Sequence, residues 1–350
     1  MHFNSLNAQK YNWWVNGQVF KGFVIAHSPK VQHLIKATPE GFELNFQKEL
    51  NGTQYWESLY NKPIINYGLS YYDLNNDEQL GKLIIGSAAV DIPLARKEHT
   101  NLFFRIGTGV VFSTNPYDRE TNNQNTMIGS PLTFLIQSRF TYEILLGEHF
   151  KLTPNINITH ASNGALSLPN RGINMLTANI GCSYRLTESQ KADFTVVEPS
   201  ITQKYTFYGL LSTGQHTFSL QNREAAPFFN FALIGQKFIN QKSDLQFGLE
   251  YFHSLALKKD LRDSWFQRQK NETPDFRRAG VLIGHELKAN KIGFIAQFGA
   301  YIYNPSKAKQ PVYQRYGLKY KFLQHGVAQI GLKVHSATAE AIEFSIGYSL

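Results

Sequence analysis

The chain has 350 residues, of which 14% are aromatic and 17% charged, with a formal net charge of +9 and a single cysteine, Cys182. One cysteine excludes an intrachain disulfide and makes a cysteine-based metal site implausible, and no apolar run approaches the roughly 20 residues of a membrane-spanning helix. The basic residues are scattered, a distribution that does not indicate nucleic-acid binding. A diffuse positive charge suits a surface facing anionic lipid head groups.

Residues 1–17 contain no basic segment followed by an apolar stretch, so no signal peptide is visible. We expect them to form a short segment ahead of the first strand. The cellular location of the protein must therefore be inferred from the rest of the sequence.

From about residue 40 the chain repeats one pattern, an alternating apolar and polar segment followed by a turn rich in Asn, Gly, Asp, Lys or Pro. Residues 114–128 and 257–275 instead resemble long polar loops. The predicted strands are 41–49, 63–73, 80–93, 101–113, 129–146, 149–162, 173–187, 202–212, 226–239, 243–256, 277–289, 291–303, 312–323, 326–337 and 341–350, with a further candidate at 18–27.

The last segment illustrates the alternation, because Ile342, Phe344 and Ile346 share one face while Glu343 and Ser345 share the other. A soluble β-sandwich alternates too. Many of these segments are longer than ordinary strands, however, and match the roughly 9–11 residues that cross a bilayer at a tilt. The polar face is rich in small hydrophilic residues, as in a wet lumen, and aromatic residues gather at strand ends.

We therefore predict an all-β fold, an antiparallel transmembrane β-barrel. Bacterial barrels have even strand numbers, and the favoured count is 14, with 12 and 16 as alternatives. Nothing in the sequence resembles a linker, so residues 1–350 are expected to form one barrel domain.

The stretch from His160 to Asn174 places a histidine two residues before a serine at a strand end. By parity, His160 and Ser162 continue the apolar face of their strand, and Asn174 continues the apolar face of the next. Polar groups on a lipid-facing wall are costly, by up to about 2–4 kcal/mol for a charge at the midplane. Three of them at one strand end call for a functional reason.

Ester hydrolysis of a lipid would supply that reason, with Ser162 as nucleophile and His160 as the base that takes its proton. A serine hydroxyl is a weak nucleophile alone, so the adjacent base is essential. The pair by itself also fits a plainer interpretation, in which both are interfacial polar residues at a barrel rim.

The wider stretch, His-x-Ser-Asn followed by Pro-Asn-x-Gly-Ile, resembles the PagL-type lipid A 3-O-deacylase family of outer-membrane barrels. The resemblance implies that His160 and Ser162 are catalytic and that Asn163 and Asn170 are oxyanion or positioning groups. Segments 41–44, 105–109 and 331–335 are similar to longer acyloxyacyl-hydrolase-like relatives, whereas PagL itself is a shorter eight-stranded barrel.

The family carries a glutamate directly after the Gly-Ile pair, and this chain has Asn174 there. An amide can orient an imidazole but supplies no charge to stabilise its protonated form. Activity is therefore expected to be lowered, retuned or absent.

The resemblance implies an outer-membrane esterase of Gram-negative bacteria that acts on lipid A (lipopolysaccharide) without a cofactor. The alternative is a catalytically silent barrel that serves as a structural protein, a binding module or a pore.

Other candidate sites are weaker. Gly107 and Gly109 form a Gly-x-Gly within a strand, without the helix that a phosphate-binding loop requires. Six histidines lack the spacing of a metal site: His27, His99, His253, His285, His325 and His335. We expect no metal.

Overall fold

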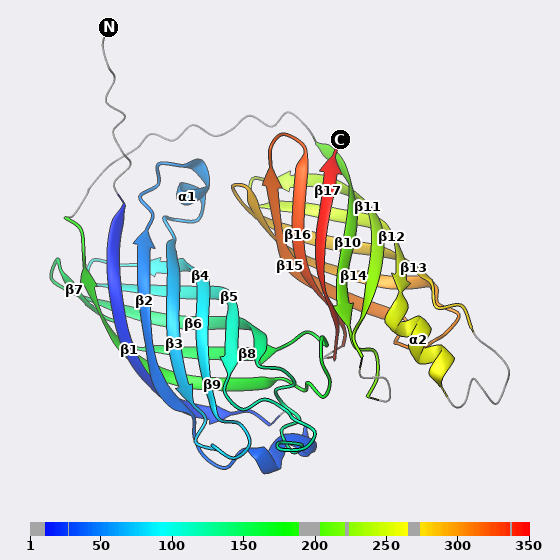
Figure 1. The fold of residues 1–350 in the computed structure, drawn as a ribbon. Coiled ribbons are helices and arrows are strands. Elements are labelled where there is room, and N and C mark those ends of the chain that lie inside the picture. Colours follow the sequence, from blue (N-terminus) through cyan, green and yellow to red (C-terminus); the bar gives the residue numbers. More distant parts are fainter. Residues whose placement is uncertain (1–10, 27, 189–203, 221–223, 265–273, 337) are drawn as a thin grey trace, which may run out of the picture. The chain divides into compact units, whose positions relative to one another are not determined.

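The computed structural model describes residues 11–26, 28–188, 204–220, 224–264, 274–336 and 338–350. The chain divides into two compact units. The first comprises Met1–Asn163 with Arg171–Pro199, and the second comprises Gly164–Asn170 with Ser200–Leu350. Each unit contains its own closed barrel (Figure 1). The expectation of one barrel of about 14 strands in a single domain is therefore wrong.

The first barrel has eight strand positions, all joined by antiparallel pairing. It closes where β9 returns to β1, with Val19 opposite Ile180. The seventh position is shared by β7 and β8, which are separated at Thr153 and Pro154. Its strands are β1 Asn12–Val24, β2 Glu40–Glu49, β3 Ile64–Asp73, β4 Lys82–Arg96, β5 Thr100–Ser113, β6 Leu132–Leu146, β7 Phe150–Leu152, β8 Asn155–Ser162 and β9 Ile173–Arg185.

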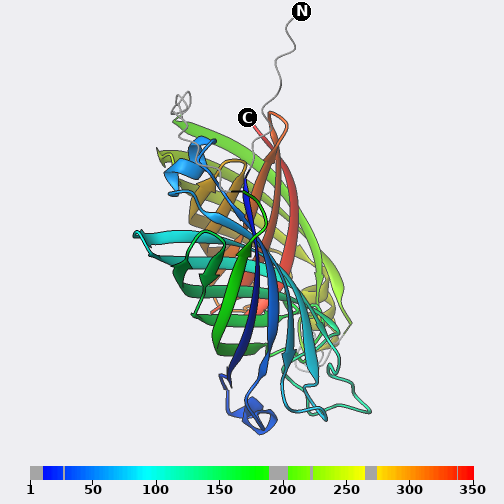
Figure 2. The same cartoon turned by 90° about the vertical axis from the view of Figure 1, so that its left-hand side faces the viewer.

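The first strand begins at Asn12, so the segment ahead of the barrel is shorter than the expected residues 1–17. Figure 2 shows these blue to green strands from a second side. Two short helices lie in the connections, the 3-10 helix η1 at Pro29–Leu34 and α1 at Tyr55–Leu59. The expected loop 114–128 holds no strand, only an isolated bridge between Asp118 and Asn122.

The second barrel also has eight antiparallel strands, and it closes where β17 pairs with β10, with Thr213 opposite Phe344. The helix α2, Leu255–Asp263, begins ahead of the expected loop 257–275 and covers it as far as Asp263, and residues 265–273 lie outside the described part. The strands are β10 Tyr205–His216, β11 Ala226–Asn240, β12 Ser243–Ser254, β13 Arg278–Ala289, β14 Ile292–Tyr303, β15 Val312–Phe322, β16 Gly326–His335 and β17 Thr338–Ser349.

The wall of each barrel is apolar outside and polar inside, as the alternation predicts. On β8, Ile156 and Ile158 are 57% and 50% exposed, while Asn155 and Asn157, which alternate with them, are buried. This inversion of the soluble pattern is typical of a barrel whose outer face contacts lipid.

No helix among the described residues is long and apolar enough to cross a membrane.

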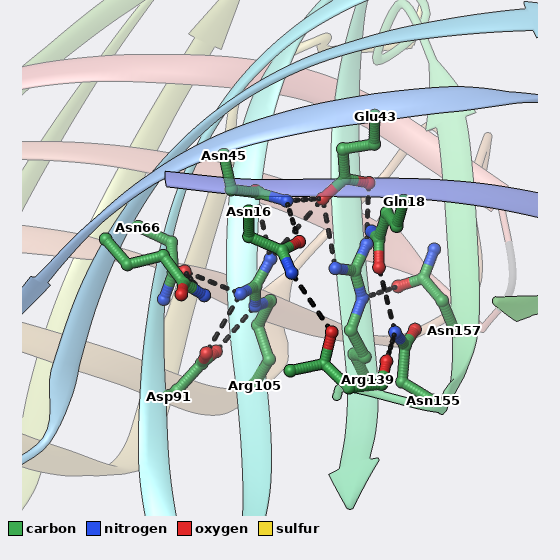
Figure 3. Close-up of polar contacts among 12 residues, drawn as sticks. Asn16, Gln18, Glu43, Asn45, Asn66, Asp91, Arg105, Arg139, Asn155 and Asn157 are labelled. Carbon is green, nitrogen blue, oxygen red and sulfur yellow. Dashed lines mark hydrogen bonds and ion pairs between the residues drawn. The ribbon is translucent and has the colours of Figure 1, made fainter. Parts of the chain in front are cut away.

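A network of charged and amide side chains fills the middle of the first barrel (Figure 3). Arg139 donates two hydrogen bonds to Glu43, at 2.7 and 3.0 Å, and Arg105 donates to Asp91 at 2.5 and 2.9 Å. Arg105 also donates to Asn66 at 2.7 Å. Buried charges are tolerated when they are paired and hydrogen-bonded in this way.

One end of the first barrel is closed by an apolar core. Val31 and Leu34 of η1 and Met127 and Ile128 of the 114–131 connection pack there against inward-facing strand residues. Ala161 of β8 and Ile173 of β9 belong to the same core. The end of β8 is therefore backed by tightly packed apolar side chains.

The interior of the second barrel is also occupied by ion pairs. Arg315 contacts Glu250 at 2.8 Å and Glu343 at 2.5 Å. Arg278 contacts Glu340 at 2.5 Å, and the Nζ atom of Lys333 lies 3.5 Å from the centroid of the Phe252 ring.

Candidate active site

His160, Ser162 and Asn174 lie on the outer wall of the first barrel, on the neighbouring strands β8 and β9. His160 and Asn174 are directly opposite each other in the antiparallel register. All three side chains are half-buried, while Thr159 and Ala161 beside them are buried. The face that strand parity predicts for the three residues is therefore the face on which they lie.

A short hydrogen bond joins the side chains of His160 and Asn174. Nδ1 of His160 lies 2.6 Å from Oδ1 of Asn174. A carbonyl oxygen only accepts, so Nδ1 carries the proton in this contact. In a neutral imidazole the other nitrogen, Nε2, then keeps its lone pair. This is the tautomer that a general base requires.

Ser162 lies two positions beyond His160 on the same face of β8, opposite Phe134 of β6. Alternate residues of a strand are separated by about 7 Å along the strand. A histidine ring can extend over much of that separation. Proton transfer from the Ser162 hydroxyl to this ring remains a prediction.

Gly172 leaves room for the histidine ring. A Cβ atom at this position would lie 2.7 Å from Cε1 and 3.3 Å from Nε2 of His160, and its φ of +75° is in the left-handed region that glycine tolerates. Its amide donates to the carbonyl of Met127 at 2.9 Å. The 114–131 connection therefore holds the glycine against the ring.

The two predicted oxyanion or positioning asparagines occupy different surroundings. Asn163 is fully buried, and its Nδ2 donates to Oγ of Ser130 at 3.0 Å, which in turn donates to the carbonyl of Leu132 at 2.8 Å. This contact ties the end of β8 to the segment just ahead of β6, and the part of Asn163 in the site remains a prediction. Asn170 belongs to the segment Gly164–Asn170 of the second unit, and its part in the site remains a prediction.

Apolar side chains surround the three polar ones on the outer wall. Ile136 of β6 is opposite His160, and the amide of Ile25 donates to the carbonyl of Asn174 at 2.8 Å. Ile136 and Ile158 are each about half exposed. The site is a polar group of side chains set into a lipid-facing surface.

The corresponding strands of the second barrel offer an internal comparison. There the seventh and eighth strands, β16 and β17, present Leu332 and Val334 outward, and Leu332 is opposite Ile342. His335, at the end of β16, is buried and contacts Glu340. On the strand pair β16–β17 these outward positions are therefore apolar. On the corresponding pair of the first barrel, β8–β9, the outward positions hold His160 and Asn174.

The described residues contain no group of three or more His, Cys, Asp or Glu side chains that could hold a metal ion. Five of the histidines considered from sequence lie in described parts, and His27 lies outside them. Gly107 and Gly109 lie within β5, as expected for strand glycines.

The fold and the site together define an outer-membrane β-barrel protein with a polar group on its lipid-facing wall. Residues 40–183 match the family model "Lipid A 3-O-deacylase (PagL)", and residues 203–350 match "Acyloxyacyl hydrolase, C-terminal domain". The two matches fall on the first and the second barrel. The chain belongs to the PagL-type lipid A 3-O-deacylase and acyloxyacyl-hydrolase-like family of outer-membrane β-barrels.

Two solved structures are similar to about half of the chain. The outer-membrane enzyme PagL is 15% identical, covering 47% of this chain and 97% of its own, with a TM-score of 0.33. Neisserial surface protein A is 6% identical, covering 49% and 96%, with a TM-score of 0.33. A search of the curated proteins found no match.

Two contributors to the site could not be assigned a role from sequence. Ser130 precedes a strand and has no motif of its own. Gly172 matched the family pattern, but its contact with the histidine ring depends on a fold that brings Met127 beneath it.

Proposed function

We propose that this protein removes an ester-linked acyl chain from lipid A, with Ser162 as nucleophile, His160 as general base and Asn174 as the group that orients the histidine. The observation that carries the proposal is the 2.6 Å hydrogen bond between His160 Nδ1 and Asn174 Oδ1 on the outer wall of the barrel. The family's activity supports the same reaction class.

The chemistry would follow from the tautomer. With its proton on Nδ1, His160 would take the Ser162 hydroxyl proton on Nε2 while the serine oxygen attacks the ester carbonyl. The imidazolium would return that proton to the leaving sugar hydroxyl, leaving an acyl-serine. A water molecule, activated by the same histidine, would then release the fatty acid.

The surroundings support a lipid substrate. The acyl chain would lie along the exposed side chains of Ile136 and Ile158, and the ester would reach Ser162 near the strand end. The long connections 25–39 and 114–131 lie at this rim, and barrels of this kind carry their longer loops on the extracellular side. Lipid A occupies the outer leaflet on that side.

A catalytically silent barrel is the second candidate, and one observation favours it. Asn174 provides no negative charge to stabilise the protonated histidine, a role that the acid fills in the serine protease triad. Ion pairs and apolar cores fill both barrels, which argues against a pore.

Purified protein incubated with lipid A in detergent micelles tests the proposal, with released fatty acid measured by mass spectrometry. Ser162→Ala should lower the rate by at least about a thousandfold. Ser138→Ala is the matched control, because Ser138 is a half-buried outward serine on β6, opposite Ile158. It should stay within about twofold of wild type. Equal rates for Ser162→Ala and wild type would overturn the assignment.

A further inference from the structure

The second barrel has a cavity of about 720 Å³ at one of its rims. The helix α2 follows β12 directly and forms one side of the cavity, and the segment 274–277 ahead of β13 forms another. This rim carries the connections 217–225, 255–277 and 304–311, whereas the opposite rim has turns of two or three residues. The longer connections indicate the extracellular side.

Cationic side chains gather in this cavity. Lys258, Lys259 and Arg262 of α2 line it together with Arg277, and Asp275 is the carboxylate among its lining residues. The remaining lining is apolar, including Leu255, Leu261 and Phe276. A ligand that fits this lining combines negative charge with apolar surface.

The existing partners of the cations are mostly exposed. Lys259 pairs with Glu224, which is 82% exposed, and Arg262 pairs with Asp263 at 3.1 Å. The Nζ atom of Lys258 lies 5.4 Å from the centroid of the Phe276 ring. Exposed ion pairs are weak, so a phosphate, which binds several cations at once, can replace them.

Arg277 is held differently, since it donates to both carboxylate oxygens of Asp275, at 2.9 and 3.0 Å. These hydrogen bonds, with a backbone amide, lower the pKa of Asp275 to about 2. Asp275 therefore stays ionised at neutral pH and fixes Arg277 at the cavity wall. The three cations of α2 carry most of the attraction for an anion.

The cavity begins where the lipid-facing wall ends. Phe276 packs edge-on against His253, with ring centroids 4.9 Å apart. His253 is on the outward face of β12, two residues after Tyr251, and is opposite Phe229, which is 47% exposed. Cations next to an apolar membrane face attract anionic head groups.

We propose that this rim cavity, bounded by α2 and the segment 274–277, binds the phosphate-bearing head group of an outer-membrane lipid. Lys258, Lys259 and Arg262 contact the phosphate, and Phe276 and Leu255 contact the adjoining apolar part. The proposal does not rest on hydrolysis at the first barrel. Both lipid A and an anionic phospholipid carry this chemistry.

Binding to full-length Ser162→Ala protein in detergent micelles tests the proposal, because lipid is not consumed in that background. The probes are bisphosphorylated lipid A, the same lipid after phosphatase treatment, and phosphatidylglycerol, each titrated at two salt concentrations. The test variant is Lys258→Gln/Lys259→Gln/Arg262→Gln. The control, Lys242→Gln/Lys291→Gln/Lys321→Gln, removes the same charge at the opposite rim.

We expect the α2 variant to bind at least one phosphorylated lipid about tenfold more weakly, with the control within twofold and higher salt weakening wild-type binding. Loss for lipid A alone, phosphatidylglycerol alone or both supports the proposal and identifies the source. Unchanged binding of both lipids by a folded α2 variant overturns it. Equally tight binding of lipid A with and without phosphate overturns it too.

Discussion

Nδ1 of His160 and Oδ1 of Asn174 lie 2.6 Å apart across the β8–β9 pair, so an amide occupies the place at which the family pattern has a carboxylate. The amide fixes the ring and its tautomer. It supplies no charge to the imidazolium that forms when the histidine accepts a proton. In this chain the orientation of the His160 ring is therefore separated from the stabilisation of its positive charge. Substitutions at Asn174 can test each of these two effects.

Asn174→Glu should raise kcat for acyl release from lipid A by at least tenfold, because a carboxylate stabilises the protonated histidine. Asn174→Gln is the matched control, since it has the length of glutamate without its charge. Rates are measured with purified protein in micelles. If the glutamate variant is no faster than the glutamine variant, Asn174 does not occupy the position of the acid.

Gly172→Ala should reduce the rate at least tenfold, because its Cβ would lie 2.7 Å from Cε1 of His160 and displace the ring. The left-handed backbone adds a cost of about 1–2 kcal/mol in the free energy of unfolding. Gly147→Ala separates the two effects. Gly147 has a φ of +76° but nothing within 4 Å of the added Cβ, so it should lose stability while keeping its rate. Equal rates for the two alanine variants would contradict the assigned role of Gly172.

Alternation along the chain predicted the strands well but not how they close. The predicted segments correspond to the sixteen strand positions, with 149–162 split at Thr153 and Pro154. Alternation is a local property, whereas closure depends on pairs such as Val19 with Ile180 and Thr213 with Phe344. Those partners are far apart in sequence, and nothing in either strand indicates which of the others it will meet.

Parity predicted the outward face of His160, Ser162 and Asn174 because it needs only the strand itself. The contacts behind the site were not predictable in this way. Asn163 reaches Ser130 because β8 pairs with β6, and Gly172 meets the His160 ring because the loop beneath it is anchored on Met127. Helix α2 was missed because its polar composition resembles a loop and its apolar face has only Ala256, Leu257 and Leu261.

Arg139→Met should lower the free energy of unfolding by about 3–5 kcal/mol, because it leaves Glu43 buried without its closest partner. The double variant Glu43→Gln/Arg139→Met should be less destabilised than the single one. Lys21→Met, in the exposed pair with Glu40, should change stability by less than about 1 kcal/mol. Urea unfolding in lipid vesicles measures all three. Equal effects for Arg139→Met and Lys21→Met would contradict the buried network.

Protein reconstituted in a planar bilayer should show no unitary conductance steps. Arg105, Arg139 and their carboxylate partners fill the first barrel, and Arg278, Arg315 and theirs fill the second. A porin measured in the same bilayer serves as the positive control. Stable steps from the folded protein would favour the pore interpretation.

The most direct test of the central claim is the mass spectrum of lipid A from Gram-negative cells that express either wild type or Ser162→Ala, at equal levels of folded barrel. We expect wild type alone to yield lipid A lighter by one ester-linked acyl chain. Identical spectra, with neither sample losing an acyl chain, would contradict the assignment of this protein as a Ser162-dependent lipid A deacylase.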